Sequence, residues 1–147
     1  MLYIAPKVQL AISSVLDIAY NIADRPVPSQ IITARHQVPR RYLEPLLQQL
    51  VRDGILLSAR GPKGGYRLAR ERSAISLGDI ARSISLIDTA IMDAPTELSA
   101  RVLTPIWERL SRETLATLDT LTLQHLCDAA HRQRINSEIR ATLDFTI

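Results

Sequence analysis

A run of cations, glycines and a proline near the middle of the chain carries the clearest chemistry. It reads Arg60-Gly61-Pro62-Lys63-Gly64-Gly65 and is followed by Tyr66-Arg67-Leu68. Glycine and proline disfavour a helix there, so the pattern predicts two short strands joined by a loop. Arg60 and Lys63 at the tip of that loop indicate an anionic ligand that can approach the backbone closely. A solvated hairpin without a ligand is the alternative.

The charge of the chain is concentrated around this loop. The 147 residues include 18 Lys or Arg and 15 Asp or Glu, so the formal net charge is +3. Between Arg35 and Arg72, nine cations stand against three carboxylates, which gives +6 there and leaves the remainder at −3. A basic centre in a nearly neutral chain indicates a surface for a polyanion. No nucleophile–base pair, carboxylate pair or phosphate-binding P-loop pattern appears, so an enzyme is not expected.

Apolar residues at helical spacing predict the elements that position the loop. A first helix is expected over 6–23, and two more over 29–36 and 39–53, with a tight turn at Gln37-Val38 between them. Gly54 is a natural helix end. The residues expected to face inward on the third helix are Tyr42, Leu43, Leu46, Leu47, Leu50 and Val51. Helices joined by so short a turn have helix-turn-helix dimensions, although a plain helical pair with a solvated basic end would look alike.

The second half of the chain is predicted to be helical as well. Ser76 is expected to cap a helix that ends near Ser83, 86–98 is interpreted as a linker, and a long helix begins at Ser99 or Thr104 and ends near 119. Thr122 would cap a further helix, and 132–147 a last one. The apolar face of the long helix comprises Leu103, Ile106, Trp107, Leu110 and Leu118. This face has no obvious mate in a small domain, so we expect it to pair with a second copy; folding back on its own domain is the alternative.

Metal and redox chemistry is weakly indicated. Cys127 is the only cysteine, which excludes an internal disulfide and an all-cysteine metal site within one chain. Cys127 and His131 share a helical face and His125 lies off it, so an inert buried thiol is favoured over a metal or redox site. Asp88 and Asp93 in the linker are interpreted as solvated. We therefore predict no metal and no cofactor.

The composition predicts the cellular compartment, and the position of His36 at a helix end suggests its role. A single cysteine is typical of a reducing, cytoplasmic setting. No signal peptide is apparent, and no segment approaches the ~18 consecutive apolar residues of a membrane span. His36 ends the helix before the tight turn, where it would contact a phosphate or serve as a solvated cap.

Five short motifs, taken together with the distances between them along the chain, indicate a protein family. They are Leu16-Asp17-Ile18-Ala19, Tyr42-Leu43-Glu44, Gly54-Ile55-Leu56, the string from Arg60 to Ala69, and Ile75-Ser76-Leu77-Gly78-Asp79-Ile80. Together they resemble the Rrf-two family of bacterial winged-helix transcription regulators, over roughly 7–87. The resemblance implies a mainly α fold: a winged helix-turn-helix domain at 1–85 with a two-stranded wing, a linker at 86–98, and a helical dimerisation region at 99–147.

The same resemblance implies double-stranded DNA as the ligand. Arg41, Tyr42 and Glu44 match recognition-helix positions that relatives use on bases and phosphates, and Arg60 and Gly61 match a wing pair that enters the minor groove. The predicted DNA-binding residues are Lys7, Ser29, Arg40, Arg41, Tyr42, Glu44, Arg60, Gly61 and Lys63. Cations in this set would neutralise phosphates or read bases.

Four features depart from the family pattern. Pro39 stands where a capping serine or threonine is usual, Gln37 replaces a turn glycine, and Pro45 falls inside the recognition helix. The linker lacks the cysteines that hold an iron–sulfur cluster in some members, so a cluster of that type is not expected.

The sequence therefore predicts a homodimeric transcription regulator, acting as a repressor on an imperfect palindrome. Two other interpretations stay open at this point. One is a regulatory adaptor that binds a protein through its helical C-terminal half. The other is a sensor of a small molecule, with its pocket between the linker and the long helix.

Overall fold

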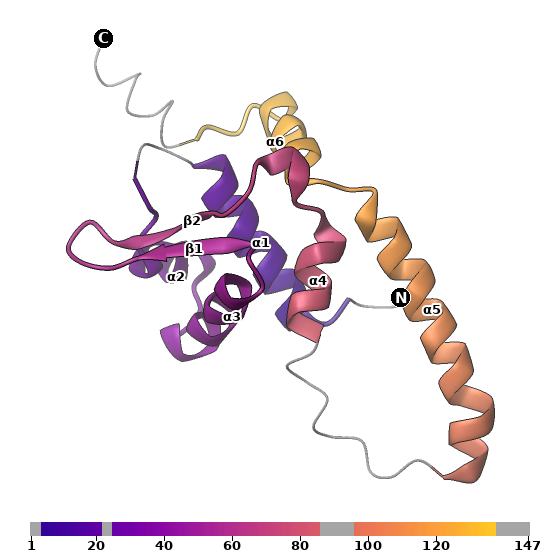
Figure 1. Cartoon of the computed structure of the whole chain (residues 1–147). Coiled ribbons are helices and arrows are strands. Elements are labelled where there is room, and N and C mark those ends of the chain that lie inside the picture. Colours follow the sequence, from indigo (N-terminus) through magenta and orange to yellow (C-terminus); the bar gives the residue numbers. More distant parts are fainter. Residues whose placement is uncertain (1–3, 22–24, 86–95, 138–147) are drawn as a thin grey trace.

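The chain folds as a winged helix with a long helix at its edge (Figure 1). The computed structural model describes residues 4–21, 25–85 and 96–137. Its elements are α1 (Pro6–Tyr20), α2 (Ser29–His36), α3 (Arg40–Arg52), β1 (Leu56–Ala59), β2 (Gly65–Leu68), α4 (Leu77–Ser85), α5 (Thr104–Asp119) and α6 (Leu123–Arg132). Helix α1 lies at the centre, where its apolar stripe contacts α2, α3, α4, α6 and β2. The predicted mainly α class with a small wing is confirmed.

Helices α2 and α3 form the predicted helix-turn-helix. Gln37 adopts a left-handed conformation between them, with φ of 52°, which explains why glycine would suit this turn. Pro39 precedes α3 and provides no side-chain cap. At the other end Gly54 has φ of 73°, and the Ile55 N–H donates to the Leu50 carbonyl at 2.9 Å, as in a Schellman motif. Both ends of α3 are therefore set by the residues beside it.

One prediction about α3 is wrong. Tyr42 was expected on the buried face, but 58% of it is exposed. The buried residues are Leu43, Leu46, Leu47 and Leu50, whose spacing covers one side of a helix and leaves Tyr42 one position off that side. Val51 is half-buried at the margin of the same side. Tyr42 instead lies under the guanidinium of Arg41, whose Cζ is 5.0 Å from the ring centroid.

The wing is an antiparallel pair of strands that is tied down at its base. Leu56 pairs with Leu68 and Ala59 with Gly65, which leaves 60–64 as the loop. The segment before α2 adds a bridge, because the Val27 N–H donates to the Tyr66 carbonyl and the Tyr66 N–H to the Val27 carbonyl, each at 2.8 Å. The wing is thereby held against the start of the helix-turn-helix.

Gly65 is the position where this bridge tolerates no side chain. Its φ is 152°, and a Cβ there would lie 2.3 Å from the Val27 carbonyl oxygen. We expect Gly65→Ala to lower the free energy of unfolding by about 3 kcal/mol, because both the backbone conformation and the bridge are lost. Urea unfolding measures this. Gly61→Ala is the matched control: Gly61 also has a positive φ, 98°, but its Cβ would meet nothing within 4 Å. A cost of about 1 kcal/mol is expected there, and equal losses at both positions would contradict the steric explanation.

The two later helices are capped as predicted. The Ser76 hydroxyl accepts from the Asp79 N–H and the Asp79 carboxylate accepts from the Ser76 N–H, both at 3.0 Å, which is a capping box at the start of α4. Thr122 and His125 form an equivalent box at the start of α6. These boxes use short-range partners, which is why the sequence identified both helix starts.

Helix boundaries differ from the predictions at three places. The long helical run starts at Glu97 after Thr96, earlier than either predicted start, and a π-helical turn at Ser99–Leu103 accommodates Pro105. Helix α1 ends at Tyr20, and 22–23 of the predicted first helix lie outside the described residues. The predicted last helix does not form over 133–137, because Arg134 adopts φ of 58° and ends α6; 138–147 lie outside the described residues.

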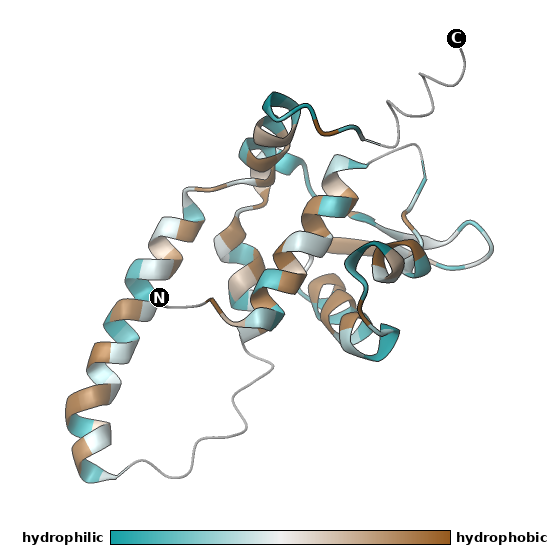
Figure 2. Ribbon diagram, turned by 180° about the vertical axis from the view of Figure 1, so that it is seen from behind, coloured by the Kyte–Doolittle hydropathy of each residue, from teal (hydrophilic) through white to brown (hydrophobic). Residues whose placement is uncertain are grey.

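The N-terminal half of α5 stands away from the rest of the molecule (Figure 1). Apolar residues recur along this half in Figure 2, and Leu103, Ile106, Trp107 and Leu110 are exposed. The C-terminal half of α5 packs on α4 and contributes Leu118 to a core that also includes Leu123 and Cys127 of α6. Among the described helices, none has the length and apolar content to cross a lipid bilayer.

Candidate nucleic-acid interface

A groove separates the wing from the helix-turn-helix. It encloses about 380 Å³ between the start of α2, the first turns of α3 and the wing loop. Its lining residues are Pro28, Ser29, Gln30, Arg40, Glu44, Gln48, Ser58, Ala59, Arg60, Gly61, Gly64, Gly65 and Tyr66. Polar side chains and glycine backbone dominate this lining, which suits contact with a hydrated, charged ligand.

Most of the predicted DNA-binding residues meet at or beside this groove. Ser29, Arg40, Glu44, Arg60 and Gly61 line it, although they come from three separate segments of the chain. The remaining predicted residues lie around it or apart from it. Arg41 and Tyr42 are exposed on the same first turn of α3, and Lys63 is exposed in the wing loop. Lys7 is exposed at the start of α1 and does not line the groove.

The first turn of α3 concentrates positive charge in a way that an isolated helix would avoid. It begins with Arg40 and Arg41 and contains no acidic residue. The N-terminus of a helix is already the positive end of its dipole, so cations there are locally unfavourable. The same arrangement binds an anion well, since backbone N–H groups and guanidinium groups point to one place. A departure from a local rule of this kind is expected at a functional surface.

Arg40 is paired with Glu44 one turn later on the same helix. The Arg40 Nε donates to Glu44 Oε2 at 2.9 Å and an Nη donates to Oε1 at 3.3 Å. Exposed pairs at this spacing contribute only about 0.3–0.5 kcal/mol. Arg40 can therefore exchange the carboxylate for a phosphate at small cost, and Glu44 can then accept a hydrogen bond from a base.

Gln48 and Tyr66 belong to the groove and were not predicted. Gln48 Nε2 donates to the Tyr66 hydroxyl at 3.3 Å, which joins α3 to β2. Burial raises the pKa of the Tyr66 phenol above its ordinary value, and the Glu44 carboxylate raises it further. Tyr66 therefore stays neutral. Gln48 lies four residues after Glu44 on the same helix, and this spacing is the signal that could have identified it.

His36 does not line the groove, and its side chain lies beside Asp17 of α1. Its Nε2 lies 3.6 Å from a carboxylate oxygen of Asp17 on α1, and the side chain is largely buried. The other Asp17 oxygen accepts from Arg35 at 2.5 Å. Both predicted roles of His36, phosphate contact and solvated cap, are therefore replaced by an attachment of α2 to α1.

The candidate metal and redox residues are engaged elsewhere. Cys127 is fully buried in the core, and burial raises the pKa of its thiol. His125 Nδ1 accepts from the Thr122 N–H at 3.1 Å, while the His131 ring lies against Tyr20 with centroids 5.2 Å apart. Within 4–21, 25–85 and 96–137, no three His, Cys, Asp or Glu side chains are placed to hold a metal ion. Asp88 and Asp93 fall outside those ranges.

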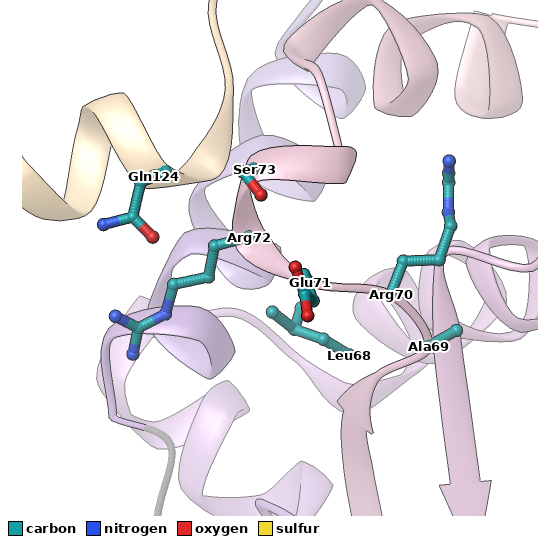
Figure 3. A pocket seen from close by; sticks show the side chains of 7 residues that line it. All are labelled: Leu68, Ala69, Arg70, Glu71, Arg72, Ser73 and Gln124. Atoms are coloured by element: carbon teal, nitrogen blue, oxygen red, sulfur yellow. The ribbon is translucent and has the colours of Figure 1, made fainter.

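A second hollow, of about 620 Å³, lies between the end of the wing and α6 (Figure 3). Arg70 and Arg72 point in opposite directions from it, and Glu71 lies between them. Arg70 donates to the Ala74 carbonyl at 3.0 Å, and Arg72 to the Ala19 carbonyl at 2.5 Å. Both arginines point away from the hollow and donate to backbone carbonyls. Their charges are therefore not directed at a common point where a ligand could bind.

The comparison with protein families identifies one family over most of the chain. The Rrf2 model, described as an iron-dependent transcriptional regulator, matches residues 4–129. The donor groups of this chain do not fit an iron centre of thiolates. Its single cysteine is buried in the core with a raised thiol pKa, and the described histidines have the structural partners given above.

Relatives and solved structures agree on the kind of protein. The chain is 33% identical over 150 residues to the HTH-type transcriptional regulator IscR of Yersinia enterocolitica, with 92% of this chain and 88% of the relative covered. It resembles the structure of T. potens IscR with a TM-score of 0.71 at 27% identity, covering 92% and 93% of the two chains. The structure of CymR, the global cysteine regulator of B. subtilis, matches with a TM-score of 0.67 at 29% identity over 88% and 98%. These relatives are regulators and not enzymes, and the chain belongs to the Rrf2 family of DNA-binding transcription regulators.

Proposed function

We propose that the chain acts as a homodimeric repressor in the bacterial cytoplasm, bound to a palindromic operator without an iron–sulfur cluster. The observation that carries this proposal is the meeting of Arg40 on α3 and Arg60 on the wing at one groove. In a winged helix, α3 would enter the major groove and the wing would reach the adjacent minor groove. Arg60 suits the narrow minor groove, whose negative potential attracts arginine.

The dimer part of the proposal is supported by the exposed face of α5. Trp107 is 53% exposed, and Leu103, Ile106 and Leu110 are exposed beside it. A contiguous apolar patch of this kind typically marks an interface. Leu118 was predicted to belong to the same face, but it is only 9% exposed and packs in the core of its own chain. We therefore leave Leu118 out of the proposed interface.

A cavity along α5 adjoins this patch. It encloses about 510 Å³ between the residues before α1, the helix α4 and α5 itself. Apolar side chains including Val8, Trp107 and Leu115 line it. The exposed patch and the cavity share Trp107 and Leu110, so a second copy related by a twofold axis beside α5 would cover both with its own α5. Such an interface is self-complementary and closed.

Salt dependence tests the placement of the basic surface. Several arginine–phosphate contacts imply that affinity for DNA falls steeply with salt, by a slope of about −0.9 per neutralised phosphate. We expect Lys63→Ala to weaken binding to all sequences alike and to make the slope less steep by about 0.9 per protomer. Fluorescence anisotropy over a range of salt concentrations measures both quantities.

Arg112→Ala is the matched control for this experiment. Arg112 is exposed on α5, and the helix α5 lies on the opposite side of the molecule from the wing (Figure 1). The Arg112 variant should keep the slope of the unaltered chain. A slope that does not depend on Lys63, or binding that does not depend on salt, would refute the proposed surface.

A further inference from the structure

The C-terminal end of α5 is clamped to α4 by a bidentate ion pair. Arg82 donates from its two Nη atoms to the two oxygens of Asp119, at 2.7 and 2.5 Å. The pair lowers the pKa of the Asp119 carboxyl, chiefly through the hydrogen bond from Arg82. Asp119 also lies directly over Gly78, where a Cβ would be 1.8 Å from Asp119 Oδ1. The clamp is thus built from a glycine, a carboxylate and a guanidinium on two elements.

Backbone hydrogen bonds reinforce the same junction. The Leu77 N–H donates to the Leu121 carbonyl at 2.8 Å, and the Leu123 N–H donates to the Ile75 carbonyl at 3.0 Å. The turn between α5 and α6 is thereby paired with the residues that open α4. The N-terminal half of α5 has no comparable attachment among the described residues, so the junction sets the direction in which α5 leaves the domain.

The last turn of α4 is also joined to the recognition helix. The Ser83 hydroxyl donates to Asp53 at 2.5 Å, and Gln49 Nε2 donates to the same carboxylate oxygen at 3.0 Å. Ile80 and Ile84 of α4 are buried in the common core. Helix α4 therefore links the C-terminal end of α3, whose first turn would lie on DNA, to the C-terminal end of α5, whose N-terminal half would lie at the twofold axis.

A small change of angle at the clamp would displace the far end of α5 by several ångströms. From Asp119 to Ile106 the arm of α5 is about 20 Å long at a rise of 1.5 Å per residue. A tilt of about 10° at one end of such an arm displaces the other end by roughly 3.4 Å, the length of one base pair. The pair itself is exposed, and exposed pairs contribute little to stability. Removing the pair should therefore leave the chain folded, so that an effect on the direction of α5 can be measured.

We propose that the Arg82–Asp119 clamp over Gly78 is a positioning device that fixes the distance between the two recognition helices, and so selects the spacer length between operator half-sites. This inference rests on the proposed dimer and its palindromic operator. Arg82 and Asp119 are positioning residues, since they touch neither DNA nor the second copy in this scheme.

The test compares spacer preference among variants of the full chain. Operators are first selected from random duplex DNA with the unaltered protein, and the half-sites are then separated by one or two base pairs more or fewer. We expect the unaltered chain to lose about 10–100-fold in affinity for a change of one base pair. Arg82→Gln and Asp119→Asn should each reduce this discrimination by about two- to fivefold, the range that an exposed ion pair can account for, while their binding to the best spacer weakens only slightly.

Arg109→Gln is the matched control. Arg109 pairs with Glu113 within α5 at 3.9 Å, so this substitution removes an exposed ion pair that joins no two elements. It should keep the full spacer preference. Gly78→Ala should reproduce the loss of preference, because its methyl group displaces Asp119 from Arg82.

The outcomes separate this inference from the proposed function. Clamp variants that discriminate between spacers as sharply as the unaltered chain would overturn the inference, as would an equal loss of affinity for every spacer. If the unaltered protein selected no paired half-sites, or stayed monomeric, the proposed function would fail and the inference with it.

Discussion

A chain carrying Leu110→Glu is expected to be monomeric and to bind its operator about 10²–10⁴-fold more weakly. Leu110 lies in the exposed apolar patch of α5 with Ile106 and Trp107, so a carboxylate there would be buried unpaired in the dimer. A monomer loses the effective concentration that links the two half-site contacts, which accounts for the size of the effect. Analytical ultracentrifugation gives the mass, and anisotropy with the selected operator gives the affinity.

Ala116→Glu provides the matched control for the dimer experiment. Ala116 is exposed on the same helix, six residues on and therefore on a different side of it. The change adds the same charge, yet the dimer and its affinity should persist. Both variants should unfold at the temperature of the unaltered chain where that chain is monomeric, because neither side chain is in the core. A dimer that survives Leu110→Glu would place the interface elsewhere.

Charge reversal at the wing is expected to have the second large effect. Arg60→Glu puts a carboxylate where the groove between wing and α3 would meet phosphates or the minor-groove floor. The loss of one contact of about 1–3 kcal/mol is then added to like-charge repulsion, so affinity should fall by roughly 10²–10³-fold. Anisotropy at a fixed salt concentration measures this loss.

The milder change Arg60→Ala distinguishes reading from attraction. If Arg60 reads the minor groove, its removal should relax the sequence preference in the flank of the operator more than it weakens binding to random DNA. Arg52→Glu is the control for the reversal, because Arg52 is exposed at the far end of α3 and donates to Gln49 at 2.9 Å. Equal losses from Arg52→Glu and Arg60→Glu would show that only net charge matters.

The local elements were predictable because their signals lie within a few residues of each other. The leucines of α3, the stop at Gly54 and the two capping boxes each depend on partners at most seven residues apart. The glycines of the wing loop, likewise, exclude a helix whatever surrounds them. The motifs in these same segments carried the family resemblance, which the family comparison then confirmed.

The burial and contacts of individual side chains were harder to predict, because they depend on residues from distant parts of the chain. His36 faces Asp17 of α1, and Leu118 is covered by the domain core, although both had been placed at surfaces. Tyr42 was expected inside, yet the four leucines of α3 already fill the space beneath it. Periodicity gives the side of a helix, but what covers that side depends on the packing of other elements.

The sequence by itself determined the class of protein, since a basic helix-turn-helix followed by an arginine-tipped, glycine-rich hairpin has few other uses. The effector, the operator and the domain boundary in 86–98 stay predictions. Only the tertiary structure brought Arg40, Glu44 and Arg60 to one groove and seated Asp119 on Gly78 beside Arg82. The physical reason is range: backbone preferences act over one or two turns, whereas a groove or a clamp exists only after segments far apart in the chain have packed on a common core.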